Sequence, residues 1–224
     1  MSLRLALIAS GDGTNVQAIL DAVQRQVLDA SIRLVLCNRP GANVLERARR
    51  AGLPHMVLDH AVHPDRAAHD AAMIRAIRDS GADTVVLAGY MRLLTPAFLQ
   101  AFPGRVLNIH PALLPAFPGL HGLGEAHAWG VKLAGCTVHF VDEAMDHGAI
   151  VIQAAAPRLD HEDLEACTRR IRALEHRIYP QALQWLASGR ISLNGRLASL
   201  ADAGLPLASL PATCLVWPPL EEGF

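Results

Sequence analysis

Short apolar runs alternate with segments of helical periodicity through the first half of the chain. Apolar runs of strand length lie at 3–9, 32–37, 54–58, 83–88 and 106–110. The segments between them carry apolar residues at helical spacing, as at Val16, Ile19, Leu20, Val23 and Val27. Helices are therefore expected at 16–27, 43–51, 65–80 and 96–102, with Gly52 and Gly81 just past the ends of two of them. This alternation predicts an α/β fold: a doubly wound, mostly parallel sheet with a Rossmann-like amino-terminal half and right-handed crossovers.

The pattern is less regular after Pro118. We expect a helix at 120–129, strands at 136–141 and 149–156, and a long helix at 162–186 that Pro180 kinks. From Asn194 onward, several proline and glycine residues occur without a clear period, which predicts a loop with a short strand. The sequence thus predicts one catalytic domain at 1–190 and a carboxyl-terminal tail at 191–224.

Composition narrows the class of protein. The chain has 224 residues, of which 51% are hydrophobic and 18% charged, as expected for a globular domain with a sizeable core. A formal net charge of −1 offers no electrostatic footprint for nucleic acid or an anionic membrane. The four cysteines form no C-x-x-C pair, which argues against a zinc site or disulfide framework and fits a reducing cytosol. We expect neither a signal peptide nor a membrane span, so the predicted location is cytoplasmic.

The strand at 106–110 ends in two polar residues suited to catalysis. Asn108 and His110 project from the same side of this strand, because side chains alternate with a period of two. Ligands of open α/β sheets bind at the carboxyl ends of strands, and Pro111 ends this one. An amide donor beside a titratable imidazole suits a reaction that builds negative charge on an oxygen and moves a proton. The alternative is that both residues serve only local hydrogen bonding.

The turn that follows the first strand is a candidate anion site. Gly11 and Gly13 allow backbone N–H groups to approach an anion, and Thr14 and Asn15 open the next helix. Val16 stands at the third glycine position of a dinucleotide fingerprint, and no Walker lysine follows. The turn therefore favours a phosphate monoester over NAD or ATP, with a tight turn that binds nothing as the alternative.

Three other polar residues each allow a functional and a structural interpretation. Arg92, between Met91 and Leu93, suits a flat apolar ligand with a polar edge, or it is an ordinary surface arginine. Asp146 would favour the charged form of His110 if the two meet, or it caps a turn. Glu175 could hold an amine, or it lies on a solvated helix face.

A series of short segments, in order along residues 3–190, resembles the motifs of folate-dependent phosphoribosylglycinamide formyltransferases. The segments are Ser-Gly-x-Gly-Thr-Asn15, Leu-Ala-Gly-Tyr-Met-Arg92, Asn-Ile-His-Pro-Ala-Leu-Leu-Pro115, Pro-Gly-Leu-His121, Thr-Val-His-Phe-Val141, Asp146 with Gly148, and Glu-His-x-x-Tyr-Pro180. Each motif alone is weak or moderate, but together in this order they make a specific resemblance.

The resemblance implies a role for each matching residue. Asn108, His110 and Asp146 match the catalytic triad of that family. Gly13, Thr14 and Asn15 match its substrate-phosphate loop, and Arg66 matches a second phosphate contact. Glu175 matches the residue that holds the glycinamide end of the substrate. The residues that match the folate pocket are Met91, Arg92, Leu93, Leu94, Val141, Asp142, Glu143, Ala144 and Met145.

The resemblance also implies a reaction. The amine of 5'-phosphoribosylglycinamide would attack the formyl carbon of 10-formyltetrahydrofolate, the cosubstrate, with no metal involved, as a step of purine biosynthesis. Asn108 and protonated His110 would stabilise the tetrahedral oxyanion, while Asp146 keeps His110 charged and assists proton transfer through water. The implied partners are these two small molecules, with no nucleic acid and no membrane, and the expected state is a monomer or a weak homodimer.

The chain departs from the family pattern at several positions. Gly-Leu-Gly-Glu-Ala-His127, after His121, replaces a polar run, Arg172 stands where the family varies, and His147 replaces a common glycine. The catalytic residues are unaffected.

Three other functions share part of this pattern. A formyltransferase acting on initiator methionyl-tRNA needs an additional RNA-binding domain and a basic surface, which are not expected here. A formyltetrahydrofolate hydrolase carries an extra amino-terminal regulatory domain, whereas the first predicted strand here begins at Leu3. A non-catalytic sugar-phosphate-binding module would use Gly11–Asn15 but has no use for Asn108, His110 and Asp146 together.

Overall fold

The computed structural model describes residues 2–202 and 214–224. The strands are β1 (Leu3–Ala9), β2 (Ala30–Cys37), β3 (His55–Val57), β4 (Thr84–Leu87), β5 (Val106–His110), β6 (Leu133–Phe140), β7 (Ile150–Pro157), β8 (Ile191–Asn194), β9 (Leu197–Leu200) and β10 (Leu215–Trp217). The helices are α1 (Thr14–Gln24), α2 (Asn43–Arg50), the short 3-10 helix η1 (His60–Val62), α3 (Arg66–Asp79), α4 (Pro96–Ala101), α5 (Gly122–Trp129) and α6 (Leu164–Ala187). Among these described helices, none combines the length and apolar character that crossing a membrane requires.

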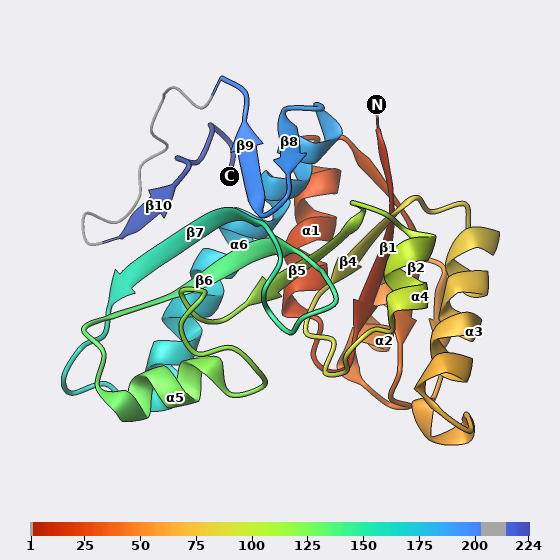
Figure 1. Cartoon of the computed structure of the whole chain (residues 1–224), viewed down its shortest axis with the longest axis horizontal. Helices are drawn as coiled ribbons and strands as arrows, with labels where there is room; N and C mark the ends of the chain where they lie inside the picture. Colours follow the sequence, from red (N-terminus) through yellow and green to blue (C-terminus); the bar gives the residue numbers. More distant parts are fainter. Residues whose placement is uncertain (1, 203–213) are drawn as a thin grey trace.

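The strands of the described residues form one sheet in the order β3-β2-β1-β4-β5-β6-β7-β9-β8, with β10 paired to β7 (Figure 1). Strands β1 to β5 pair in parallel, as the alternation of strands and helices predicted. From β5 onward, β6 and β7 pair antiparallel. The connection between β6 and β7 is too short for a crossover helix, so it can join only antiparallel neighbours. The predicted doubly wound, mostly parallel α/β fold is confirmed.

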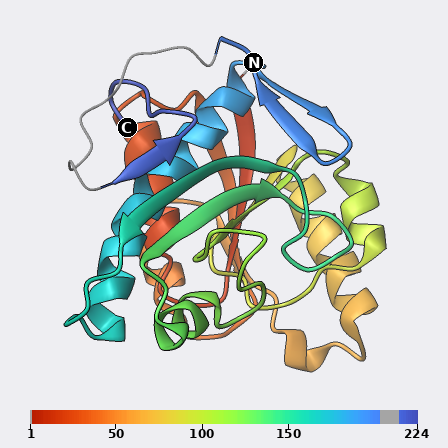
Figure 2. The ribbon, with the colours of Figure 1, turned by 60° about the vertical axis from the view of Figure 1, so that its left-hand side comes forward.

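Helices cover both faces of the sheet and bury two apolar clusters (Figures 1 and 2). Alternation along β1 sends Leu5 and Leu7 to the cluster under α1, α2 and α6, and Ala6 and Ile8 to the cluster under α3 and α4. Because β1 is buried on both faces, its sequence is apolar throughout, which made the strand easy to predict.

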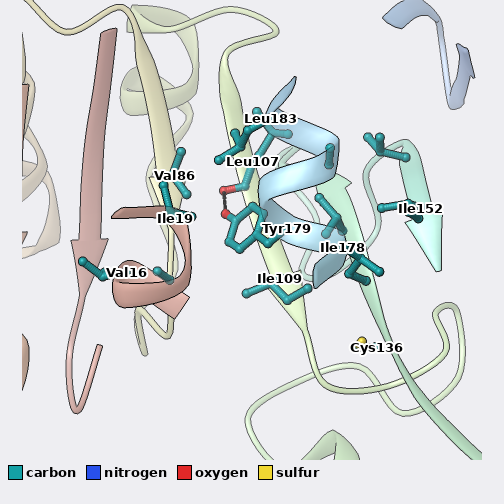
Figure 3. Close-up of a cluster of buried hydrophobic side chains, with 14 of the residues drawn as sticks. Val16, Ile19, Val86, Leu107, Ile109, Cys136, Ile152, Ile178, Tyr179 and Leu183 are labelled. Atoms are coloured by element: carbon teal, nitrogen blue, oxygen red, sulfur yellow. Dashed lines mark hydrogen bonds between the residues drawn. The ribbon is translucent and has the colours of Figure 1, made fainter. Parts of the chain in front are cut away.

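Helix α6 supports the strand ends that carry the candidate catalytic residues. The Tyr179 hydroxyl lies 3.0 Å from the carbonyl oxygens of both Leu87 and Leu107. Figure 3 shows the Tyr179 ring next to β5, with a dashed line from its hydroxyl to the backbone oxygen of Leu107. Leu107 precedes Asn108, so this contact ties the backbone at the end of β5 to the core.

The carboxyl-terminal residues are more regular than the predicted loop with a short strand. β8 and β9 form an antiparallel hairpin at the edge of the sheet, with Asn194 paired to Leu197 across the turn. β10 pairs antiparallel with β7. The hairpin is largely exposed and each of its strands has only 4 residues, so its sequence is too short for a clear strand pattern. Part of the predicted tail, 203–213, lies outside the described residues, and the domain boundary at residue 190 stays a prediction.

His69 is a fully buried histidine beneath the loop that leads into α3. Its Nε2–H donates to the Leu58 carbonyl at 3.0 Å. Burial lowers the pKa of His69 from 6.5, and the charges of His63 and Arg92 act in the same direction. The unfolded chain therefore takes up a proton at a higher pH than the folded chain does. Since the unfolded state binds more protons in this window, the contribution of His69 to stability falls as pH drops below about 6.5.

Replacing His69 with glutamine is expected to make stability less sensitive to acid. Glutamine can donate to the Leu58 carbonyl but does not titrate, so the free energy of unfolding should fall less between about pH 7 and about pH 5. Urea titrations at the two pH values measure this difference. His55→Gln, which replaces an exposed histidine of β3, serves as the control. Equal pH dependence in His69→Gln and the wild type would contradict the assignment.

Candidate active site

The carboxyl ends of β1, β4 and β5 meet at one edge of the sheet. β4 pairs with both β1 and β5, so the segments that follow the three strands become neighbours. These segments are Gly11–Asn15, Gly89–Leu94 and the loop after His110. The chain runs outward from β1 to β2 on one side and returns to β4 on the other, which makes this edge the switch point where open α/β sheets bind ligands.

His110 is buried with both ring nitrogens facing oxygen acceptors. Its side chain is 4% exposed. Nε2–H donates to the Phe117 carbonyl at 2.8 Å, and Nδ1 lies 3.4 Å from Oδ2 of Asp146. The ring thus has a carbonyl oxygen and a carboxylate oxygen within reach of its two nitrogens. The predicted meeting of His110 and Asp146 is therefore present in the structure.

Asp146 is fixed by its backbone and by a loop amide. Its φ of 52° lies in the left-handed region, which aspartate tolerates better than most residues do. Oδ2 accepts the Gly119 N–H at 2.7 Å, and Oδ1 lies 3.7 Å from His139 Nε2. The carboxylate thus reaches two histidines and ties the loop after β6 to the loop before α5.

Asn108 is held by His139, which sequence analysis did not select. The two residues lie opposite each other in the β5–β6 register. His139 Nδ1–H donates to the Phe140 carbonyl at 2.9 Å, which leaves Nε2 to accept from Asn108 Nδ2 at 3.1 Å. Burial lowers the pKa of His139, consistent with this neutral form. One amide hydrogen of Asn108 is thereby used, and the other remains for a ligand.

His139 belongs to the predicted strand at 136–141 and shares its alternating pattern. Its position opposite Asn108 depends on how β6 pairs with β5, which the pattern along one strand does not specify.

A first cavity of about 290 Å³ opens beside Asn108, His110 and Asp146. Two segments predicted to bind a ligand together, 91–94 and 141–145, both line this cavity although they are far apart in the sequence. The lining residues are Leu87, Gly89, Tyr90, Met91, Arg92, Leu93, Leu94, Asn108, Ile109, His110, Pro111, Gly119, Leu120, His139, Val141, Asp142, Glu143, Ala144, Met145 and Asp146. A cavity of this lining suits a flat, mostly apolar molecule with polar edges.

A second cavity of about 540 Å³ adjoins the first and contains the glycine turn. Gly13 ends the turn with φ 70°, and a Cβ atom there would lie 2.4 Å from Val44, so only glycine fits. Helix α1 begins at Thr14 with no side-chain cap, and Thr14 and Asn15 line the cavity, so the first turn of this helix could bind an anion there. The two cavities share wall residues Gly89, Met91, Ile109, Pro111 and Leu120.

Glu175 reaches the second cavity from α6. Its side chain is buried, and Oε2 accepts the Asn15 Nδ2–H at 2.8 Å. Burial raises the pKa of Glu175, while the hydrogen bond from Asn15 and the charge of Arg172 act against this rise. An N–H donor from a ligand would stabilise the charged carboxylate, so this residue is suited to hold an amine or amide.

The predicted phosphate contact of Arg66 is not reproduced in the cavity lining. Arg66 is the first residue of α3, is exposed, and lines neither the first nor the second cavity. Arg39, which follows β2, lines the second cavity instead. Sequence analysis missed Arg39, although its place after a parallel strand beside the glycine turn is where an anion contact is expected.

Over residues 2–202 and 214–224, no group of three or more histidine, cysteine, aspartate or glutamate side chains could hold a metal ion. The chemistry available at the first cavity consists of an amide donor, an imidazole and a carboxylate. Together they can stabilise an oxyanion and transfer a proton.

Comparison with known proteins relates this chain to one family. The model of the formyl transferase family matches residues 3–183. The phosphoribosylglycinamide formyltransferase of Bacillus subtilis is 42% identical over 193 residues, which cover 86% of this chain and 97% of that protein. The trifunctional purine biosynthetic protein adenosine-3 of Drosophila melanogaster is 42% identical over 198 residues. These residues are 88% of this chain, and the chain spans 15% of the length of that relative.

Similar solved structures include members of the same family. The glycinamide ribonucleotide transformylase 1 of Symbiobacterium toebii has a TM-score of 0.88 at 48% identity, covering 89% of this chain and 94% of that chain. A formyltetrahydrofolate deformylase from Pseudomonas syringae is also similar, with a TM-score of 0.83 at 27% identity. The deformylase match covers 90% of this chain but 67% of that chain.

Proposed function

The chain belongs to the formyl transferase family, and we propose that it is a phosphoribosylglycinamide formyltransferase. In this proposal it transfers the formyl group of 10-formyltetrahydrofolate to the amine of 5'-phosphoribosylglycinamide, a step of de novo purine (IMP) biosynthesis. The relatives that carry this activity in their names match this chain over nearly their whole length. The similar deformylase is 27% identical to this chain, against 42% for the Bacillus subtilis formyltransferase, which makes hydrolysis the weaker alternative.

One observation carries the proposal: two cavities of different chemistry meet at the end of β5. The second cavity offers the glycine turn and Arg39 for a phosphate, and Glu175 for the amine end. The first cavity offers a wall suited to a reduced folate, with Asn108, His110 and Asp146 along it. A ribonucleotide amine and a folate formyl group bound in these cavities would approach each other beside Asn108 and His110.

The proposed reaction is direct transfer. The amine attacks the formyl carbon, a new C–N bond forms, and the carbonyl oxygen becomes an oxyanion. The free N–H of Asn108 donates to this oxyanion, and the positive charge of protonated His110 stabilises it. The bond from the formyl carbon to the folate nitrogen then breaks, and that nitrogen takes up the proton that the attacking amine loses. Asp146 lies near enough to favour the charged form of His110 and to guide this proton through water.

Replacing Glu175 with glutamine is expected to weaken binding of the ribonucleotide and leave the folate unaffected. Glutamine still accepts the Asn15 N–H but lacks the negative charge. The KM for phosphoribosylglycinamide should therefore rise by about 10-fold or more. Steady-state kinetics with each substrate varied in turn measure this difference. Glu165→Gln, on the exposed start of the same helix, is the control. An equal rise in both KM values would contradict the placement of Glu175.

A two-substrate assay tests the proposed function. The protein is mixed with 10-formyl-dideazafolate and phosphoribosylglycinamide, and absorbance of the deformylated folate is followed. Product that requires both substrates supports the transferase. Product without the amine indicates the hydrolase. No product, while ribose phosphate still binds, indicates a binding module in which Asn108, His110 and Asp146 are structural.

The proposal also covers the partners, the oligomeric state and the location of the enzyme. We expect only these small molecules as partners, with a monomer or weak homodimer in the cytoplasm. Analytical ultracentrifugation with and without substrates measures the oligomeric state.

A further inference from the structure

The segment 142–147 lies in the connection from β6 to β7, and residues 142–146 of this segment form part of the wall of the first cavity. Backbone hydrogen bonds fix its base, where Phe140 donates to Ala149 at 2.9 Å. Beyond this base, hydrogen bonds within the described residues attach the segment to other parts of the chain at two places. One is the Gly119 N–H on Asp146, and the other is Arg196 on His147.

The contact at His147 continues into the cavity wall. An arginine only donates, so Nε2 of His147 must accept from the Arg196 guanidinium. The ring proton of a neutral imidazole then lies on Nδ1, which donates to Oδ2 of Asp142 at 2.9 Å. Oδ1 of Asp142 accepts the Ala144 N–H at 3.0 Å. A continuous chain of hydrogen bonds thus runs from Arg196 through His147 and Asp142 to the backbone of the wall.

Arg196 lies on a well-anchored part of the molecule. It stands in the turn between β8 and β9, after Gly195 with φ 59°. β8 pairs with β9 along both strands, and β9 pairs with β7 at Ile150, three residues after His147. The turn is therefore held beside the segment by the sheet itself.

We propose that Arg196 and His147 are positioning residues that hold the wall formed by 142–147 in place for the formyl donor. The proposal rests on the proposed function, because it assigns the first cavity to a reduced folate. The wall has no regular secondary structure of its own, so an attachment at His147 limits the range of conformations that Asp142 and Met145 can adopt. The carboxyl-terminal hairpin thereby contributes to donor binding without lining the cavity.

The expected effect is modest because the contact is exposed. The side chains of His147 and Asp142 are 52% and 41% exposed, and exposed ion pairs are screened by water. Arg196→Ala and His147→Gly should each raise the KM for the formyl donor by about 2- to 5-fold, with kcat and the KM for the ribonucleotide unchanged. Both substitutions remove the same contact, between Arg196 and His147. The KM for the formyl donor in the double variant should therefore equal that of either single variant, and the two effects should not multiply.

Kinetics and binding are measured together. The dissociation constant of the non-transferable folate 5,10-dideazatetrahydrofolate is determined by calorimetry for each variant. Arg196→Lys keeps a donor and should recover part of the affinity, whereas Arg50→Ala removes an exposed arginine of α2 and should have no effect. Hydrogen exchange of the amides in 142–147 should be faster in Arg196→Ala than in the wild type.

The outcomes separate this proposal from the proposed function. Wild-type protein without transfer activity that still binds the folate contradicts the transferase, while the dissociation constants continue to test the positioning role. Wild-type protein that does not bind the folate overturns both. Unchanged donor affinity and unchanged exchange in Arg196→Ala and His147→Gly overturn the positioning role alone. Equal losses for both substrates also overturn it, because the wall lines only the donor cavity.

Discussion

Replacing Asn108 with alanine is expected to lower kcat by about 100- to 1,000-fold, the usual cost of losing one oxyanion donor. His139 accepts one amide hydrogen of Asn108, so the amide is held in place and its other hydrogen is preorganised to donate to the oxyanion. Alanine leaves His110 beside the oxyanion and leaves both substrate cavities in place. The KM values should therefore change little, because the lost interaction belongs to the transition state.

The Asn108 prediction is checked by steady-state kinetics together with urea unfolding. Gln24→Ala removes an exposed side-chain amide at the end of α1 and should leave turnover unchanged. A free energy of unfolding within about 1 to 2 kcal/mol of the wild type would establish that Asn108→Ala folds. Near-normal kcat in that folded variant would contradict a catalytic role for Asn108.

Replacing Asp146 should also cost most of the turnover, by about 100-fold or more, through a different route. His110 would lose the carboxylate 3.4 Å from Nδ1 that favours its charged form, and the proton released by the amine would lose its guide. Asp146→Asn separates charge from structure, since asparagine tolerates the positive φ and can still accept the Gly119 N–H. Asp146→Asn and Asp146→Ala are therefore expected to be similarly slow.

Asp160→Ala is the matched control for these variants, because it removes an exposed carboxylate that pairs with Lys132. Single-turnover rates at saturating substrates report the chemical step directly. If Asp146→Asn kept wild-type rates while Asp146→Ala lost them, the role of Asp146 would be to hold the Gly119 loop and not to act on His110.

The parts of the fold that the sequence predicted well are those whose patterns depend on burial. β1 and β5 were predicted with their observed bounds, because both are apolar runs ended by a turn or a proline. The start of α1 was placed two residues too late, since the position of Gly13 in the left-handed region, and not apolar spacing, determines where the helix begins. The β8–β9 hairpin was missed because few of its side chains are buried.

The candidate site was predicted to the extent that its residues lie along one strand. Asn108 and His110 follow from alternation in β5, and the structure places both on the first cavity. The approach of Asp146 to His110 depends on a non-local loop, so the residues alone left it open and the resemblance to a family suggested it. His139 was missed because its place opposite Asn108 comes from strand pairing across the sheet.

Transfer of a labelled formyl group tests the central claim most directly. The protein is mixed in single turnover with folate carrying a ¹³C-formyl group and with phosphoribosylglycinamide, and the products are identified by mass spectrometry. The account predicts that the label appears in the formylated ribonucleotide and that none is released as formate. Labelled formate with an unmodified ribonucleotide would contradict direct transfer and would make the protein a hydrolase.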